Sequence, residues 1–143
     1  MKIYFGISNS TTISRKWENI ELVLVDNFQT FLNKYPAHAI YLPFSLLEQW
    51  NVTPKLHESQ IIYLTEDMQS KFGGASFILT GVAMSENDPK TSAYEAQLLS
   101  QCLIKAMDNH NIDSLGIWEG FIYNNLDTQL LLNCLNSALI DSN

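Results

Sequence analysis

Short runs of apolar residues recur along the chain, separated by polar segments. Runs rich in β-branched and aromatic side chains are typical of buried strands. Such runs predict strands over residues 3–7, 20–25, 39–42, 60–64, 76–82 and 112–118. The run over 76–82 is nearly continuous in apolar residues, as in strands buried on both faces, so we expect it to be central in the sheet.

Apolar residues at helical spacing predict helices between these strands. Helices are expected over 28–35, 45–50, 65–72 and 92–109, with a last helix beginning near residue 127. The pattern is clearest over 92–109, where Ser92 and Glu95 form a capping box before an apolar stripe at i, i+4 spacing. Two glycines, Gly73 and Gly74, end the helix over 65–72.

This alternation of strands and helices predicts one α/β domain over residues 1–143. A strand, a helix and a further strand follow one another over residues 20–42, which is typical of a parallel, right-handed β-α-β unit. We therefore expect a three-layer α/β/α architecture with a mixed, mostly parallel sheet of about six strands. A chain of 143 residues is long enough to bury a core without disulfides or metals.

Charge narrows the possible functions. Eight Lys and Arg residues stand against fifteen Asp and Glu, for a net charge of −7. Nucleic-acid binding needs a cationic stripe, which the sequence lacks, so DNA and RNA are not expected partners. The sequence shows neither a signal-peptide pattern nor an apolar run long enough to cross a membrane, so we expect a cytoplasmic protein. We interpret Cys102 and Cys134 as small buried side chains rather than a redox pair.

Catalytic and metal-binding motifs are missing from the sequence. His38, His57 and His110 lie in unrelated contexts, none with a second ligand at zinc spacing. Nucleophile elbows, C-x-x-C pairs and Gly-rich phosphate loops are not found. We therefore expect no metal and no cofactor, assign no catalytic residue, and favour a binding protein over an enzyme.

The best candidate site is formed by the segments that follow the predicted strands, because open α/β sheets bind ligands beyond their carboxyl ends. Asp26, Phe44 and Ser45 follow two of these strands, and the aromatic, Gly- and Asn-containing segment 118–125 follows the last. Aromatic rings can stack on a base, Gly120 and the next helix's N–H groups can receive phosphate, and Asp26 can accept a hydrogen bond from an exocyclic amine. Alternatively, the aromatic side chains cap the core beneath a tight turn.

The order of elements over residues 20–140 resembles a macro domain, the ADP-ribose-binding α/β module. Residues 75–84 resemble its central strand, 92–109 its long helix with Ala93 and Tyr94 near the start, and 112–118 the strand before its phosphate loop. The resemblance implies that Asp26 contacts adenine. Phe44 and Ser45 replace the family's Asn-containing loop, and its Gly-rich loop is absent, so binding without hydrolysis is expected.

We therefore expect a small protein that binds a nucleotide derivative, either ADP-ribose or a related NAD-derived or cyclic nucleotide. An alternative is an acidic immunity or inhibitor protein that binds a basic partner protein; a third is an ADP-ribosyl hydrolase. The candidate ligand-binding residues are Asp26, Phe44, Ser45, Trp118, Glu119, Gly120, Phe121, Tyr123 and Asn124.

Overall fold

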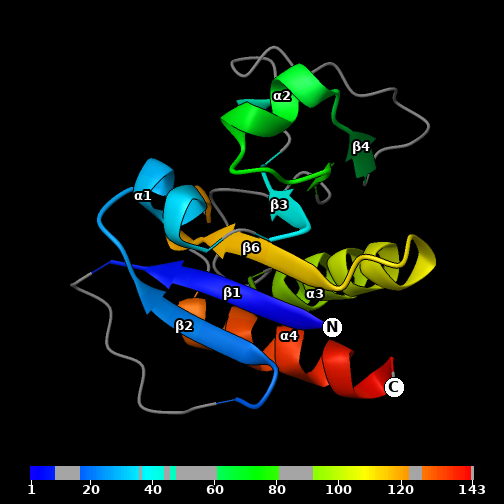
Figure 1. Ribbon diagram of the computed structural model, residues 1–143. Coiled ribbons are helices and arrows are strands. Elements are labelled where there is room, and N and C mark those ends of the chain that lie inside the picture. Colours follow the sequence, from blue (N-terminus) through cyan, green and yellow to red (C-terminus); the bar gives the residue numbers. More distant parts are fainter. Residues whose placement is uncertain are drawn as a thin grey trace.

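The computed structural model contains a six-stranded sheet in the order β2-β1-β6-β3-β5-β4 (Figure 1). It describes residues 1–8, 17–35, 37–43, 46–47, 61–80, 92–122 and 127–142. The strands are β1 (Lys2–Ile7), β2 (Ile20–Leu24), β3 (Ala39–Tyr41), β4 (Ile61–Tyr63), β5 (Phe77–Leu79) and β6 (Ser114–Trp118). All are parallel except β4, which pairs antiparallel with β5 at one edge. This mixed, mostly parallel sheet confirms the predicted fold class.

Helices cover both faces of the sheet. They are α1 (Phe28–Lys34), α2 (Glu66–Lys71), α3 (Ser92–Asn109) and α4 (Thr128–Asp141), with a short 3₁₀ helix, η3 (Glu119–Phe121), after β6. Side chains of α1 and α2 share one core cluster, and those of α3 and α4 share the other on the opposite face. In Figure 1, α3 and α4 form one layer behind the sheet. The three-layer α/β/α architecture follows from this division.

Local capping explains where two of these helices begin. The Asn27 side chain accepts a hydrogen bond from the Thr30 backbone N–H at 2.8 Å, and Asp127 accepts one from Gln129 N–H at 2.9 Å. Each satisfies a donor that the first helical turn leaves without an intrahelical partner. Both helices therefore begin where the sequence predicts.

One predicted feature of the sheet is wrong. Among the described residues, the strand expected over 76–82 spans Phe77–Leu79, and residues 81 and 82 lie outside them. This strand lies between β3 and the edge strand β4, not at the centre. Ile78 packs in the core on the α1–α2 face and Leu79 in the core on the α3–α4 face. Its apolar continuity therefore reflects burial on both faces rather than a central position. Of the helix predicted over 45–50, only residues 46 and 47 lie within the described part of the chain.

Phe31 of α1 is fully buried against β1 and β6, two neighbouring strands of the sheet. A Cβ added to Gly6 of β1 would lie 3.0 Å from Cδ1 of Phe31, and one added to Gly116 of β6 would lie 3.2 Å from Cε2. These distances are tight for a methyl group, so the two glycines make room for the ring. Among the described residues, no helix has the length and apolar character needed to cross a membrane.

Candidate functional site at the carboxyl end of the sheet

The five parallel strands end at one border, here called the carboxyl end of the sheet. After β6 the chain enters α4, which packs on the α3–α4 face, whereas Leu47, beyond β3, belongs to the core on the α1–α2 face. β6 and β3 are neighbours in the sheet. The chain therefore leaves two adjacent strands toward opposite faces, from β6 to the α3–α4 face and from β3 to the α1–α2 face. Such a switch point is where open α/β sheets bind ligands. The segment from Trp118 to Phe121 begins there.

Trp118 and Phe121 take part in an aromatic cluster with Phe28 of α1. The ring centroids lie 5.1 Å apart for Trp118 and Phe121, 4.7 Å for Phe28 and Phe121, and 6.1 Å for Phe28 and Trp118. Both Trp118 and Phe121 are half-buried, while Phe28 is buried. The cluster caps the core on the α1–α2 face, as the second interpretation of this segment expects, and it leaves part of Trp118 and Phe121 accessible.

Gly120 is exposed and lies against the indole ring of Trp118. A Cβ added to Gly120 would overlap that ring, so no other residue fits here without displacing Trp118. The indole N–H of Trp118 and the hydroxyl of Thr80, just after β5, are both buried and have no hydrogen-bond partner among the described residues. Buried polar groups without partners are uncommon in folded proteins.

The Glu119 carboxylate connects three segments of the chain. Its Oε1 accepts a hydrogen bond from the Ser8 hydroxyl at 3.5 Å, and its Oε2 accepts one from the Thr128 hydroxyl at 3.3 Å. Ser8 directly follows β1, and Thr128 is the first residue of α4. These contacts hold a half-buried carboxylate at the carboxyl end of the sheet. Sequence reasoning identified Glu119 but missed Ser8 and Thr128.

Negative charge dominates the described part of this site. Asp26 is exposed at the end of β2, and Asp127 caps the N-terminus of α4 with its own carboxylate. Glu119, bonded to Thr128, adds a second carboxylate beside that helix terminus. Segments 7–8, 25–28, 118–122 and 127–129 contain no Lys or Arg. The helix N–H groups expected to receive phosphate therefore face carboxylates, and the site suits hydrogen-bond donors better than anions.

Five of the nine candidate residues lie within the described part of the chain. Trp118, Glu119, Gly120 and Phe121 form one turn, and Asp26 lies two residues before Phe28, which contacts that turn. Four other candidates lie outside the described residues: Phe44, Ser45, Tyr123 and Asn124. Within the described ranges, no three His, Cys, Asp or Glu side chains are grouped so that they could hold a metal ion.

No protein-family model, curated protein or solved structure matches this chain. Support for a function therefore comes from the arrangement of residues at the carboxyl end of the sheet. That arrangement combines an anchored carboxylate, a second exposed carboxylate, an exposed glycine and half-buried aromatic rings.

The overlap at Gly120 gives a stability test of this turn. Gly120→Ala is expected to lower the free energy of unfolding by about 1–3 kcal/mol, because the added methyl group displaces the Trp118 indole. Urea unfolding of the single and double variants measures the effect. In a Trp118→Leu background the same substitution should cost much less, since the ring it meets is gone. An equal cost in both backgrounds would show that Trp118 does not restrict position 120.

Proposed function

We propose that the protein binds a nucleotide derivative at the carboxyl end of the sheet, as a macro-like domain without catalytic activity. The ligand class is ADP-ribose or a related NAD-derived or cyclic nucleotide. The observation that carries the proposal is the Glu119 carboxylate, held by Ser8 and Thr128 beside the switch point between β6 and β3. The free thiols of Cys102 and Cys134 suit the cytoplasm, where we expect this activity.

The charges at the site determine which end of the ligand it receives. Carboxylates accept hydrogen bonds from ribose hydroxyls and exocyclic amines, whereas they repel phosphates. Asp26 and Glu119 therefore contact the nucleoside end of the ligand, and the phosphates extend away from the start of α4. Gly120 has no side chain and is exposed, so a ligand can approach its backbone closely. The accessible parts of Trp118 and Phe121 supply apolar contact for the base.

Thermal unfolding with a panel of ADP-ribose, NAD, AMP, cyclic dinucleotides and cyclic ADP-ribose tests the proposal. A ligand at 100 times its Kd adds about 2.7 kcal/mol to the free energy of unfolding, which raises Tm by several degrees for a domain of this size. We expect such a shift with at least one compound. A flat panel would exclude nucleotide binding.

Carboxylate variants then locate the ligand. Asp26→Ala and Glu119→Gln should each weaken binding about tenfold to a hundredfold, since each removes a hydrogen bond to a charged group. Asp67→Ala is the matched control, because Asp67 is an exposed acid in the first turn of α2. Isothermal titration with the compound that shifts Tm gives the affinity of the wild type and of each of the three variants. Equal affinities in all variants would place the ligand elsewhere.

A second candidate function is the binding of a basic protein partner, in the manner of an immunity or inhibitor protein. Its support is the net charge of −7 together with Asp26, Glu119 and Asp127 at a border whose described segments lack cations. Charge complementarity of this kind steers encounter, so association should slow strongly as salt rises. Hydrolysis of ADP-ribosyl groups is a third candidate, tested by the release of free ADP-ribose from a modified substrate.

A further inference from the structure

Two carboxylates lie on either side of β1 at the carboxyl end of the sheet. β1 lies between β2 and β6, and Asp26 comes shortly after β2 while Glu119 directly follows β6. The pairing of β1 with β2 continues up to this point, since the Val25 N–H donates to the Ile7 carbonyl oxygen at 3.0 Å. Adjacent strands are about 4.8 Å apart, so β2 and β6 are separated by roughly 10 Å. A flat ring placed across the end of β1 therefore has an acidic residue on each side.

The aromatic cluster lies close to both carboxylates. Trp118 directly precedes Glu119 in the chain. A Cβ added to Gly6 would lie 3.0 Å from Cδ1 of Trp118 and 3.1 Å from Cγ2 of Val25. The indole ring therefore lies near Val25, the residue before Asp26. Aromatic rings attract cations, and the indole of Trp does so most strongly, so the rings and the carboxylates favour the same kind of ligand group.

Both features favour a flat ring that carries a positive charge. Carboxylates attract a nearby cation, and the negative face of an aromatic ring attracts it as well. The unmodified adenine of AMP and ADP-ribose is neutral, and phosphates are negative. By contrast, the nicotinamide ring of NAD⁺ is a positively charged pyridinium, and adenine gains a positive charge when a second ribose is linked to its N1 atom. A base of this kind therefore fits the site better than a neutral one.

We propose that the site selects a ribonucleoside whose base carries a positive charge. The inference rests on the proposed function, because it names which nucleoside end of the ligand the site receives. The base lies against the accessible parts of Trp118 and Phe121, with Asp26 and Glu119 beside it, and the phosphates extend away from the start of α4. Two members of the ligand class provide such a base: NAD⁺ through its nicotinamide end, and the cyclic ADP-ribose that is linked through N1 of adenine.

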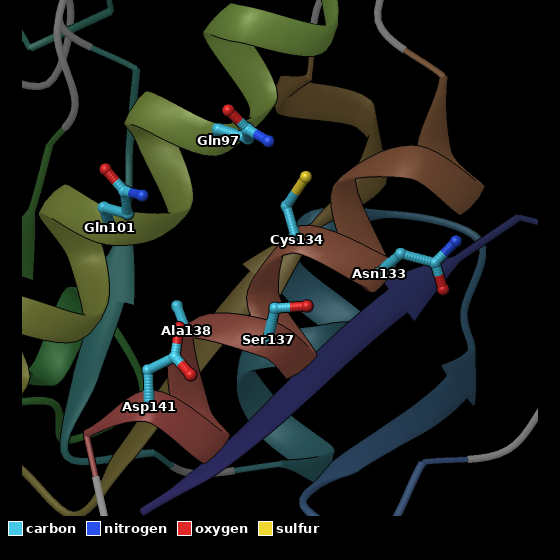
Figure 2. A pocket seen from close by; sticks show the side chains of 7 residues that line it. All are labelled: Gln97, Gln101, Asn133, Cys134, Ser137, Ala138 and Asp141. Carbon is cyan, nitrogen blue, oxygen red and sulfur yellow. The ribbon is translucent and has the colours of Figure 1, made fainter.

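A groove of about 280 Å³ between α3 and α4 provides a matched control for these carboxylates. Figure 2 shows Gln97 and Gln101 of α3 along one side and Cys134 of α4 along the other, with Asp141 near one end. Asp141 is an exposed acid like Asp26, but none of the described residues that line the groove is aromatic. Removing the charge of Asp141 should therefore leave the choice between charged and neutral bases unchanged.

Isothermal titration of the full chain with two pairs of compounds tests the inference. NADH differs from NAD⁺ by a hydride that neutralises the nicotinamide ring, and ADP-ribose carries neutral adenine in place of the cationic adenine of N1-linked cyclic ADP-ribose. Titration at neutral pH and about 0.15 M salt screens charges farther than about 8 Å from the ligand. In at least one pair, the cationic compound should bind about tenfold more tightly or better. A preference in one pair alone identifies the source of the cationic base.

The titrations separate this inference from the proposed function. If the neutral compound binds as tightly as the cationic one in both pairs, the site binds nucleotides without selecting a charged base, and the inference is overturned. If none of the compounds binds, the proposed function fails and the inference fails with it.

Charge-removing variants then test whether the two carboxylates cause the preference. Asp26→Asn and Glu119→Gln keep the size of each side chain, and the double variant should reduce the preference to about threefold or less. Asp141→Asn, the matched control in the groove between α3 and α4, should keep it. The ratio of two affinities does not change when a variant is partly unfolded, because both compounds bind the same folded state. A double variant that keeps the full preference would overturn the inference.

Discussion

Phe31→Ala is expected to lower the free energy of unfolding by about 3–5 kcal/mol. Phe31 is 0% exposed, and its ring fills the space left by Gly6 on β1 and Gly116 on β6. Neither glycine has a side chain that could move into the cavity, so the surrounding structure cannot collapse onto it. The cost therefore combines the lost transfer free energy of the ring with that of an unfilled cavity.

Urea unfolding monitored by circular dichroism measures this loss. Phe77→Ala is the matched control, because Phe77 is only half-buried on β5 and touches His38 and Tyr63 through edge-to-face contacts. Its loss should be clearly smaller, since less apolar surface is removed from water. Similar losses at the two positions would show that the glycines on β1 and β6 do not make the Phe31 site rigid.

The elements of the fold could be predicted from local patterns, but their order in the sheet could not. The helix starts at Asn27 and Asp127 depend on hydrogen bonds to backbone N–H groups two or three residues away. Such starts can be predicted from the local sequence alone. Strand order depends on pairing between distant segments: β1 pairs with β6, so that Lys2 lies beside Ser114. A continuous run of apolar residues indicates that a strand is buried on both faces, but it does not give the strand's position in the sheet. The prediction that β5 is central was wrong for this reason.

The candidate site could likewise be predicted only in part. Position after a parallel strand identified Asp26 and Glu119, because the carboxyl ends of such strands share one border. The partners of Glu119 could not be found, since Ser8 is 111 residues away along the chain and reaches it only through the pairing of β1 with β6. Likewise, Trp118 is half-buried because Phe28 of α1 packs against it. The sequence around Trp118 does not predict this contact.

Gly73→Ala is expected to lower the free energy of unfolding by about 2–4 kcal/mol, from two causes at one position. Gly73 has a φ of 67°, a left-handed conformation that costs other residues about 1–2 kcal/mol. An added Cβ would also lie 2.7 Å from the backbone carbonyl oxygen of Leu32 in α1. A backbone atom cannot turn aside as a flexible side chain can, so α2 and α1 must separate.

The neighbouring glycine separates these two causes. Gly74 also has a positive φ, 89°, but an added Cβ there would meet nothing within 4 Å. Gly74→Ala should therefore cost only the conformational part, about 1–2 kcal/mol. Urea unfolding of both variants gives the difference, which measures how tightly the turn after α2 packs against α1. Equal losses at the two positions would mean that the contact with Leu32 relaxes freely, and that the left-handed backbone alone requires glycine at both positions.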